Sequence, residues 1–187
     1  MSIAAIILAA GASKRLGRPK QTVVLEGEML VERAVRVATE AGLAPVIAVL
    51  IDAGLIDSLQ AQGATVLLNR RTYEGISSSI AVGIRWAKGM RVDGVVLMTC
   101  DQVAVTPQHL QALFASPDVV TGSRYAERTG IPAYFPAESF DALMALEGDT
   151  GARDLLRDAR SIPDESLALD VDTDADLEEA RRFLRAK

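Results

Sequence analysis

Three short runs of nearly continuous apolar residues constrain the fold of this chain most strongly. They are rich in β-branched side chains and lie at residues 3–8, 46–51 and 94–100. A strand with one face in water alternates apolar and polar residues, whereas a strand covered on both faces is apolar throughout. The runs therefore predict a mostly parallel sheet that is buried between two other layers.

Helical patterns lie between these runs. Apolar residues spaced three to four apart predict helices over residues 30–41 and 76–84, and a threonine-proline pair predicts a helix start at Thr106. A last helix is expected from about Asp174, because acidic residues come first and basic residues last, the order that the helix dipole favours. Alternating strands and helices indicate a single three-layer α/β/α domain spanning residues 1–187.

Composition narrows the class of protein. The 187 residues are 49% apolar, and 20 basic against 25 acidic side chains give a net charge of −5. An acidic chain has no overall electrostatic attraction to nucleic acid or to an anionic membrane. The one cysteine, Cys100, and the one histidine, His109, exclude an internal disulfide and a cysteine-rich or histidine-rich metal site. We expect a cytoplasmic protein with no nucleic-acid or membrane partner.

Four cations are concentrated directly after the first predicted strand. Residues 1–25 contain no acidic side chain, and seven consecutive positions hold Lys14, Arg15, Arg18 and Lys20. Ligands of open α/β sheets bind beyond the carboxyl ends of the strands. Backbone N–H groups freed by Gly11 and Gly17, together with these cations, suit a polyanion such as a triphosphate. Arg18 is the least assigned of the four and is expected to face water.

Two familiar phosphate-binding loops do not fit this segment. Five residues separate Gly11 from Gly17, which excludes the Rossmann fingerprint, and Arg-Pro-Lys follows the second glycine where a P-loop requires Lys-Ser or Lys-Thr. The alternative is a solvated basic connection between a strand and a helix. The absence of acids among the cations disfavours that alternative.

A carboxylate and a group of serines also follow predicted strands. Asp101 comes directly after the run 94–100, so it is expected at a carboxyl end, where it can hold Mg²⁺; the alternative is an aspartate that caps the next turn. Gly75 and the serines at 77–79 start a helix, where hydroxyl and free N–H groups can bind a base, a ribose or a phosphate. Serines in this position also act as plain helix caps, so both roles stay open.

The remaining reactive or aromatic side chains predict no further site. Cys100 is expected to be a buried strand thiol, because His109 lies on a separate predicted helix and secures no base near it. His109 itself is expected on a helix surface. The aromatic residues are too scattered along the sequence to form a base-stacking platform.

The segment LAAGASKRLGRPK at residues 8–20 resembles the pattern LAAGxSxRMGxxK of the nucleotidyltransferases that act on molybdenum cofactor, within the wider GT-A-like group. Leu16 stands where methionine is usual, and Val103 stands where proline usually follows the Cys-Asp-Gln motif. Four later segments are similar to the cytidylyltransferase branch and occur in the expected order: residues 74–84, 99–102, 130–132 with 148–153, and 170–177.

This resemblance implies a Rossmann-like nucleotidyltransferase fold, Mg²⁺ as cofactor, and transfer of CMP from CTP to molybdenum-bearing molybdopterin with release of pyrophosphate. CTP is preferred because guanylyl members tend to have glycine where this chain has Ala10, and a methyl group there narrows the space for a base. Alternatives are a guanylyltransferase, a nucleotidyltransferase for another small phosphorylated acceptor, and a non-catalytic chaperone that delivers the cofactor. The product would serve a molybdenum hydroxylase through transient contact.

The resemblance and the residue patterns together define the expected site. The catalytic residues are expected to be Arg15, Lys20 and Asp101. The nucleotide is expected to contact Leu8, Ala9, Ala10, Gly11, Ser13, Lys14, Arg15, Gly17, Lys20, Gly75, Ser78 and Ser79. The metal ligands are expected to be Asp101, Asp170 and Asp172, although Thr173 and Asp176 also fit a helix cap. By the resemblance, the acceptor is expected to contact Gly130, Asp149, Gly151 and Arg153, although a glycine-rich helix start explains the last three equally well.

Overall fold

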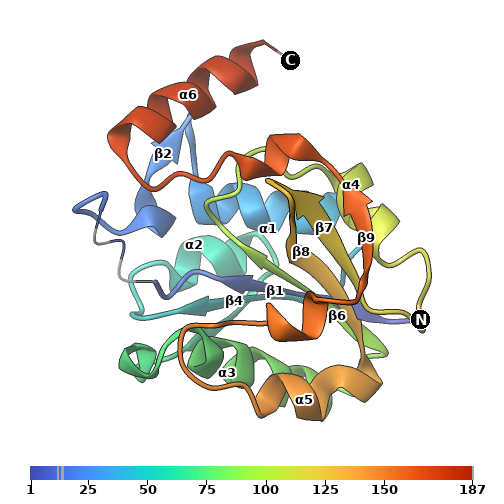
Figure 1. Ribbon diagram of the computed structural model, residues 1–187. Coiled ribbons are helices and arrows are strands. Elements are labelled where there is room, and N and C mark those ends of the chain that lie inside the picture. The colour runs from blue at the N-terminus through green and yellow to red at the C-terminus, as the bar shows by residue number, and fades with distance from the viewer. Residues whose placement is uncertain (12, 14, 187) are drawn as a thin grey trace.

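A mixed seven-stranded sheet forms the middle layer of the computed structural model, which describes residues 1–11, 13 and 15–186 (Figure 1). The strand order is β5-β4-β1-β6-β8-β7-β9. Neighbours from β5 to β6 are parallel, β8 is antiparallel to both β6 and β7, and β9 is parallel to β7. The strands are Ile3–Leu8 (β1), Val46–Leu50 (β4), Thr65–Leu68 (β5), Gly94–Thr99 (β6), Thr121–Tyr125 (β7), Arg128–Pro136 (β8) and Arg160–Pro163 (β9). A separate hairpin pairs Val24–Leu25 (β2) with Glu28–Met29 (β3).

Helices cover both faces of this sheet. In Figure 1, α1 and α4 lie above it and α3 and α5 below it, while α6 lies at the top beside β2. The α-helices are Leu30–Glu40 (α1), Ile56–Ala61 (α2), Ile76–Gly89 (α3), Pro107–Leu113 (α4), Phe140–Met144 (α5) and Asp174–Arg185 (α6). Short 3-10 helices span Lys20–Thr22 (η1), Thr72–Glu74 (η2), Ala137–Ser139 (η3), Asp154–Leu156 (η4) and Glu165–Ala168 (η5). Among the described residues, no helix is long and apolar enough to cross a membrane.

The apolar run at the start of the chain explains the three layers. All six residues of β1 are buried, and successive side chains of a strand point to opposite faces. Ile3, Ala5 and Ile7 pack into the core that α1, α4 and α6 cover. The alternate residues of β1 pack into the other core, with α3 and α5. The predicted three-layer architecture with a mostly parallel sheet is therefore confirmed.

His109 is buried, so the expectation that it lies on a helix surface is wrong. It sits on α4, which packs against β7 and β9, and its side chain turns inward. The Nε2 atom is 2.7 Å from Ser123 Oγ, and Nδ1 is 3.6 Å from Asp164 Oδ2. Burial lowers the pKa of His109 below its ordinary value, although Asp164 acts in the opposite direction. The helix start itself is as predicted, because Thr106 Oγ1 accepts a hydrogen bond from His109 N at 3.2 Å.

This buried histidine makes a prediction about stability. In the unfolded chain His109 gains a proton near pH 6.5, whereas in the fold it stays neutral to lower pH. Protons therefore favour the unfolded state below about pH 6.5, and His109 destabilises the fold by at most about 1.4 kcal/mol per pH unit. We expect the melting temperature of His109→Gln to fall less than that of the wild type between pH 7.5 and 5. Parallel curves for the two proteins would contradict this.

Candidate active site

The loop that follows β1 folds back on itself and directs Lys20 toward the end of β6. Ser13 has a positive φ of 45° and Gly17 one of 69°, and Gly17 N donates to Ser13 O at 3.2 Å. Ser13 Oγ accepts a hydrogen bond from Lys20 N at 3.0 Å, which joins the beginning of the loop to its end. The loop thus forms a closed turn, and Ser13 serves to hold its shape.

Lys20 lies between two carboxylates at this edge of the sheet. Its Nζ donates to Asp101 Oδ2 at 2.8 Å and also forms an ion pair with Asp172. Arg15 pairs with Asp172 as well. Burial opposes the charge on Lys20, but the two carboxylates outweigh it and raise the pKa of Lys20 above its ordinary value. Lys20 is therefore a fixed ammonium group at neutral pH.

Backbone hydrogen bonds bring the end of the chain to Asp101. Val171 N donates to Asp101 O at 3.1 Å, and Asp170 forms an antiparallel bridge with Gln102. Gln102 is itself buried, and its Nε2 donates to Tyr125 Oη and to Ile131 O, both at 3.1 Å. The side chains on either side of Val171 are thereby held close to Asp101.

Asp170 is the member of this group that has, within the described part of the chain, an unpartnered carboxylate oxygen. Its Oδ1 is buried with no hydrogen-bond partner among the described residues. Burial, followed by the charges of Asp101 and Asp172, raises the pKa of Asp170 to about 7. A buried, unpaired carboxylate oxygen is costly unless it is protonated or coordinates a cation. These three carboxylates are oxygen ligands of the type that Mg²⁺ and Mn²⁺ prefer, although no three such side chains among the described residues are arranged to hold an ion.

The capping prediction also holds. Thr173 Oγ1 accepts from Asp176 N at 3.3 Å, and Asp176 Oδ2 accepts from Thr173 N at 2.8 Å, a capping box at the start of α6. Capping therefore uses residues 173 and 176, and it leaves Asp170 and Asp172 for the site. Arg18 is exposed, as expected, and it also pairs with the exposed Asp174, so the start of α6 lies against the loop.

A first cavity, with a volume of about 620 Å³, opens between the loop after β1, the start of α3 and the end of β6. Asp101, Asp172 and Cys100 line it as well. The predicted nucleotide contacts that line it are Leu8, Ala9, Ala10, Gly11, Ser13, Arg15, Lys20, Gly75 and Ser79. Gly17 and Ser78 are not among its lining residues, and Lys14 lies outside the described residues.

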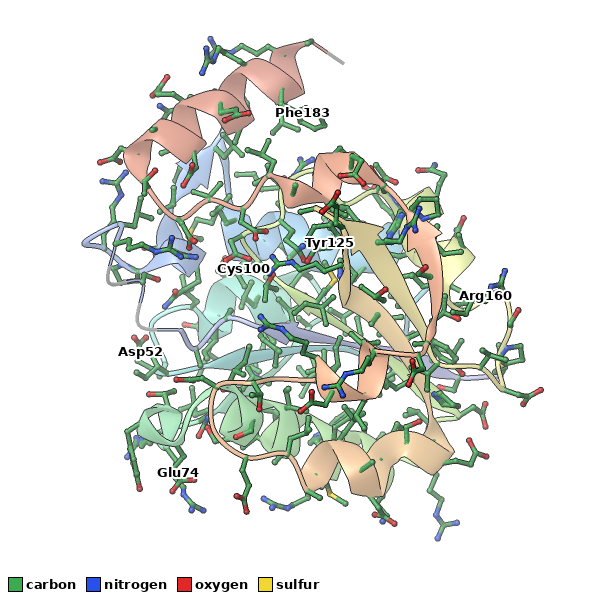
Figure 2. All side chains as sticks on the ribbon, in the orientation of Figure 1. Asp52, Glu74, Cys100, Tyr125, Arg160 and Phe183 are labelled. Carbon is green, nitrogen blue, oxygen red and sulfur yellow. The ribbon has the colours of Figure 1, made fainter. Side chains whose placement is uncertain are left out.

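A second cavity of about 230 Å³ adjoins the first. Both are lined by Leu8, Ile76, Thr99, Asp101 and Asp149. All four predicted acceptor contacts line the second cavity: Gly130, Asp149, Gly151 and Arg153. Figure 2 labels Cys100, which lines the first cavity, and Tyr125, which lines the second. Sequence segments far apart thus form two joined spaces with Asp101 on the boundary.

The start of α3 is held by Asn69, which is not among the individual residues predicted for the site. Asn69 follows β5, and its buried Nδ2 donates to Ser78 Oγ at 2.8 Å and Ser79 Oγ at 2.9 Å. Its Oδ1 accepts from Arg71 N at 2.9 Å. Ser78 Oγ also donates to Gly75 O at 2.8 Å. Both hydroxyls are therefore engaged in structural bonds. The one available signal was a polar residue directly after an apolar strand.

Gly75 permits a distant loop to close on the same helix. Its φ of 90° favours glycine, and an added Cβ would lie 2.4 Å from the carbonyl carbon and oxygen of Gly148. Asp149 Oδ1 accepts a hydrogen bond from Ile76 N at 3.2 Å, so the carboxylate caps the start of α3 from a distance in sequence. Asp149 thus joins the loop at residues 148–151 to the boundary between the two cavities.

Cys100 is buried, as predicted, and burial raises the pKa of its thiol far above the ordinary value, with Asp101 adding to the effect. A thiol in this state is a poor nucleophile at neutral pH. The charged side chains that line the first cavity are cations and carboxylates.

Residues 5–165 match the family described as the MobA-like NTP transferase domain. The chain belongs to this family. As a MobA-like NTP transferase, it is a nucleotidyltransferase family enzyme with a nucleoside triphosphate as substrate. It is similar to the purine catabolism protein PucB of Bacillus subtilis, with 28% identity over 198 aligned positions that cover 96% of each chain.

Solved structures of related proteins share the fold of this MobA-like enzyme. Rv0371c of Mycobacterium tuberculosis is 28% identical, with a TM-score of 0.78 over 97% of this chain and 98% of the other. A second structure of Rv0371c, in complex with manganese, has a TM-score of 0.72 at 27% identity, over 97% and 99% of the two chains. A nucleotidyl transferase from Methanothermobacter has a TM-score of 0.82 at 25% identity, over 100% and 99%.

Proposed function

We propose that this enzyme transfers CMP from CTP to the phosphate of molybdenum-bearing molybdopterin and releases pyrophosphate. The observation that carries the proposal is the junction of two cavities at Asp101. In this reaction an acceptor phosphate oxygen attacks the α-phosphorus of CTP, and the bond from that phosphorus to the oxygen of the leaving pyrophosphate breaks. Such a transfer needs two substrates side by side, and it is catalysed by positioning and charge neutralisation.

The first cavity is the proposed CTP site. Arg15 and Lys20 line it, and both suit triphosphate oxygens and the charge that develops on the pyrophosphate. Ala10 is buried and lines the same cavity, so its methyl group occupies space near the bound nucleotide. The preference for cytosine over guanine rests on this methyl group and on the resemblance to the cytidylyl branch.

The proposed cofactor is Mg²⁺, or Mn²⁺ in its place. The manganese complex of Rv0371c supports a divalent ion for this chain, and Asp101, Asp170 and Asp172 are the residues that would hold it. Bound there, an ion would neutralise phosphate charge. The protein's own part is to hold three carboxylates in place through the hydrogen bond from Val171 N to Asp101 O.

The second cavity is the proposed acceptor site. Ile80, Leu97 and Ile131 give it apolar walls, which suit a flat ring system. Arg128 and Arg153 also line it, and no carboxylate in the described part of the chain lies within ion-pair distance of either. Guanidinium groups without carboxylate partners suit the phosphate of the acceptor. The name of PucB refers to purine catabolism, so we propose a xanthine dehydrogenase-like hydroxylase as the recipient through transient contact.

The test is to incubate the purified protein with Mg²⁺, one nucleoside triphosphate at a time and molybdenum cofactor, and to measure pyrophosphate and dinucleotide product. We expect CTP to be the one nucleoside triphosphate that gives product. Product with GTP alone would overturn the base assignment. Pyrophosphate only with a different phosphorylated acceptor would overturn the acceptor assignment. Cofactor binding without any product would favour a chaperone.

A further inference from the structure

The ammonium group of Lys20 forms ion pairs with Asp101 and Asp172, two of the three carboxylates that are proposed to hold a divalent ion. It contacts Asp101 at 2.8 Å and Asp172 in a second ion pair, and the three side chains are only 17%, 18% and 22% exposed. Among the residues that the structure describes, no three acidic, cysteine or histidine side chains are arranged to hold a metal ion. One oxygen of Asp101 and both oxygens of Asp172 are thus already paired with cations that belong to the chain.

The same ion pairs engage the cations of the loop, which are proposed to bind the triphosphate. Arg15 and Lys20 both pair with Asp172, although both line the cavity proposed for the triphosphate. The backbone of Lys20 is held by Ser13 Oγ, but its side chain is long and its charge can move from one anion to another. The cations are thus paired with the carboxylates, whereas the proposed reaction needs the cations on the triphosphate and the carboxylates on the divalent ion.

We propose that Lys20 is a built-in counter-ion that blocks divalent-ion binding at Asp101 and Asp172 until a triphosphate draws Lys20 and Arg15 onto its own oxygens. The inference rests on the proposed function and adds an order of binding to it. An ion that entered first would face the ammonium group at short range, whereas one that enters with the triphosphate replaces it. Because coupling between two ligands is reciprocal, the ion and the nucleotide each raise the affinity of the protein for the other.

The charge balance of the site supports this exchange. Asp101, Asp170 and Asp172 carry up to three negative charges, and Lys20 with Arg15 supplies two positive ones. Adding a divalent ion without moving Lys20 leaves a net positive site. A triphosphate that enters with the ion brings anionic oxygens of its own, so the ion, Lys20 and Arg15 each keep a negatively charged partner.

The first experiment measures Mn²⁺ binding to the full-length protein without nucleotide, by electron paramagnetic resonance of the free ion. We expect weak binding by the wild type and at least about tenfold tighter binding by Lys20→Met, because one positive charge leaves the carboxylates. Lys20→Arg should bind as weakly as the wild type. Arg18→Met is the matched control: Arg18 belongs to the same loop but pairs with Asp174, so its loss should change Mn²⁺ affinity less than about twofold.

The second experiment uses the wild type alone, so it does not depend on the folding of a variant. The rate of reductive methylation of Lys20 Nζ is measured by mass spectrometry with Mg²⁺ alone, CTP alone and both. Mg²⁺ alone should leave the rate unchanged, and CTP should change it. A changed rate with Mg²⁺ alone, or equal Mn²⁺ affinity in Lys20→Met and wild type, would overturn the proposal. Neither experiment uses an acceptor, so failure here is distinct from failure of the transfer reaction.

Discussion

Asp101→Asn is expected to lower kcat at least about 100-fold, the scale of loss when one key electrostatic group is removed from an active site. Asparagine keeps the size and shape of the side chain but removes the charge at the boundary of the two cavities. That charge pairs with Lys20 at 2.8 Å and is a proposed ligand of the divalent ion. The measurement is pyrophosphate release with CTP, Mg²⁺ and molybdenum cofactor at saturating concentrations.

Asp174→Asn is the matched control for this variant. Asp174 lies near the same loop and pairs with Arg18, but its side chain is 74% exposed and lines neither cavity. Its replacement should change kcat less than about twofold, because an exposed ion pair contributes little. Turnover near the wild-type value in Asp101→Asn, with the fold verified by circular dichroism, would remove the proposed role of Asp101.

Gly75→Ala is expected to raise the KM for the acceptor at least about tenfold, since a misplaced binding loop loses contacts that position the substrate. The new Cβ would lie 2.4 Å from the carbonyl of Gly148, so the loop at residues 148–151 must move away from α3. That movement breaks the hydrogen bond from Ile76 N to Asp149. Strain at a φ of 90° adds a loss of about 1–3 kcal/mol in the free energy of unfolding.

Gly63→Ala separates strain from displacement of the loop. Gly63 also has a positive φ, 83°, but an added Cβ there would have no neighbour within 4 Å, and the residue lines neither cavity. It should lose a comparable amount of stability in urea unfolding while the KM for the acceptor stays within about twofold. If the two variants show equal KM values, the contact between Gly75 and Gly148 does not position the acceptor loop.

Local patterns in the sequence determined the layers of this protein and predicted the individual parts of its proposed site. Continuous apolar runs predict buried strands because a strand between two layers has no face in water, and β1 is buried along its whole length. A cap before a proline predicts the start of α4. A cluster of cations without acids predicts that the loop after β1 binds a polyanion. Asp101 follows β6, as expected. Each of these features depends on neighbours within a few positions, which the sequence displays directly.

Only the tertiary structure decided which of these parts meet. Lys20 and Asp172 are 152 positions apart in sequence, and no periodicity or composition predicts that they pair. Hydrogen bonding between the loop after β6 and the segment before α6 brings Asp172 to the site where Lys20 lies. Two other contacts also depend on residues that are distant in sequence. His109 on a short helix contacts Ser123 of β7, and Asp149 caps the distant helix α3. Burial, pairing and pKa depend on what lies across space from a side chain, and the packing of the sheet and its helices decides this.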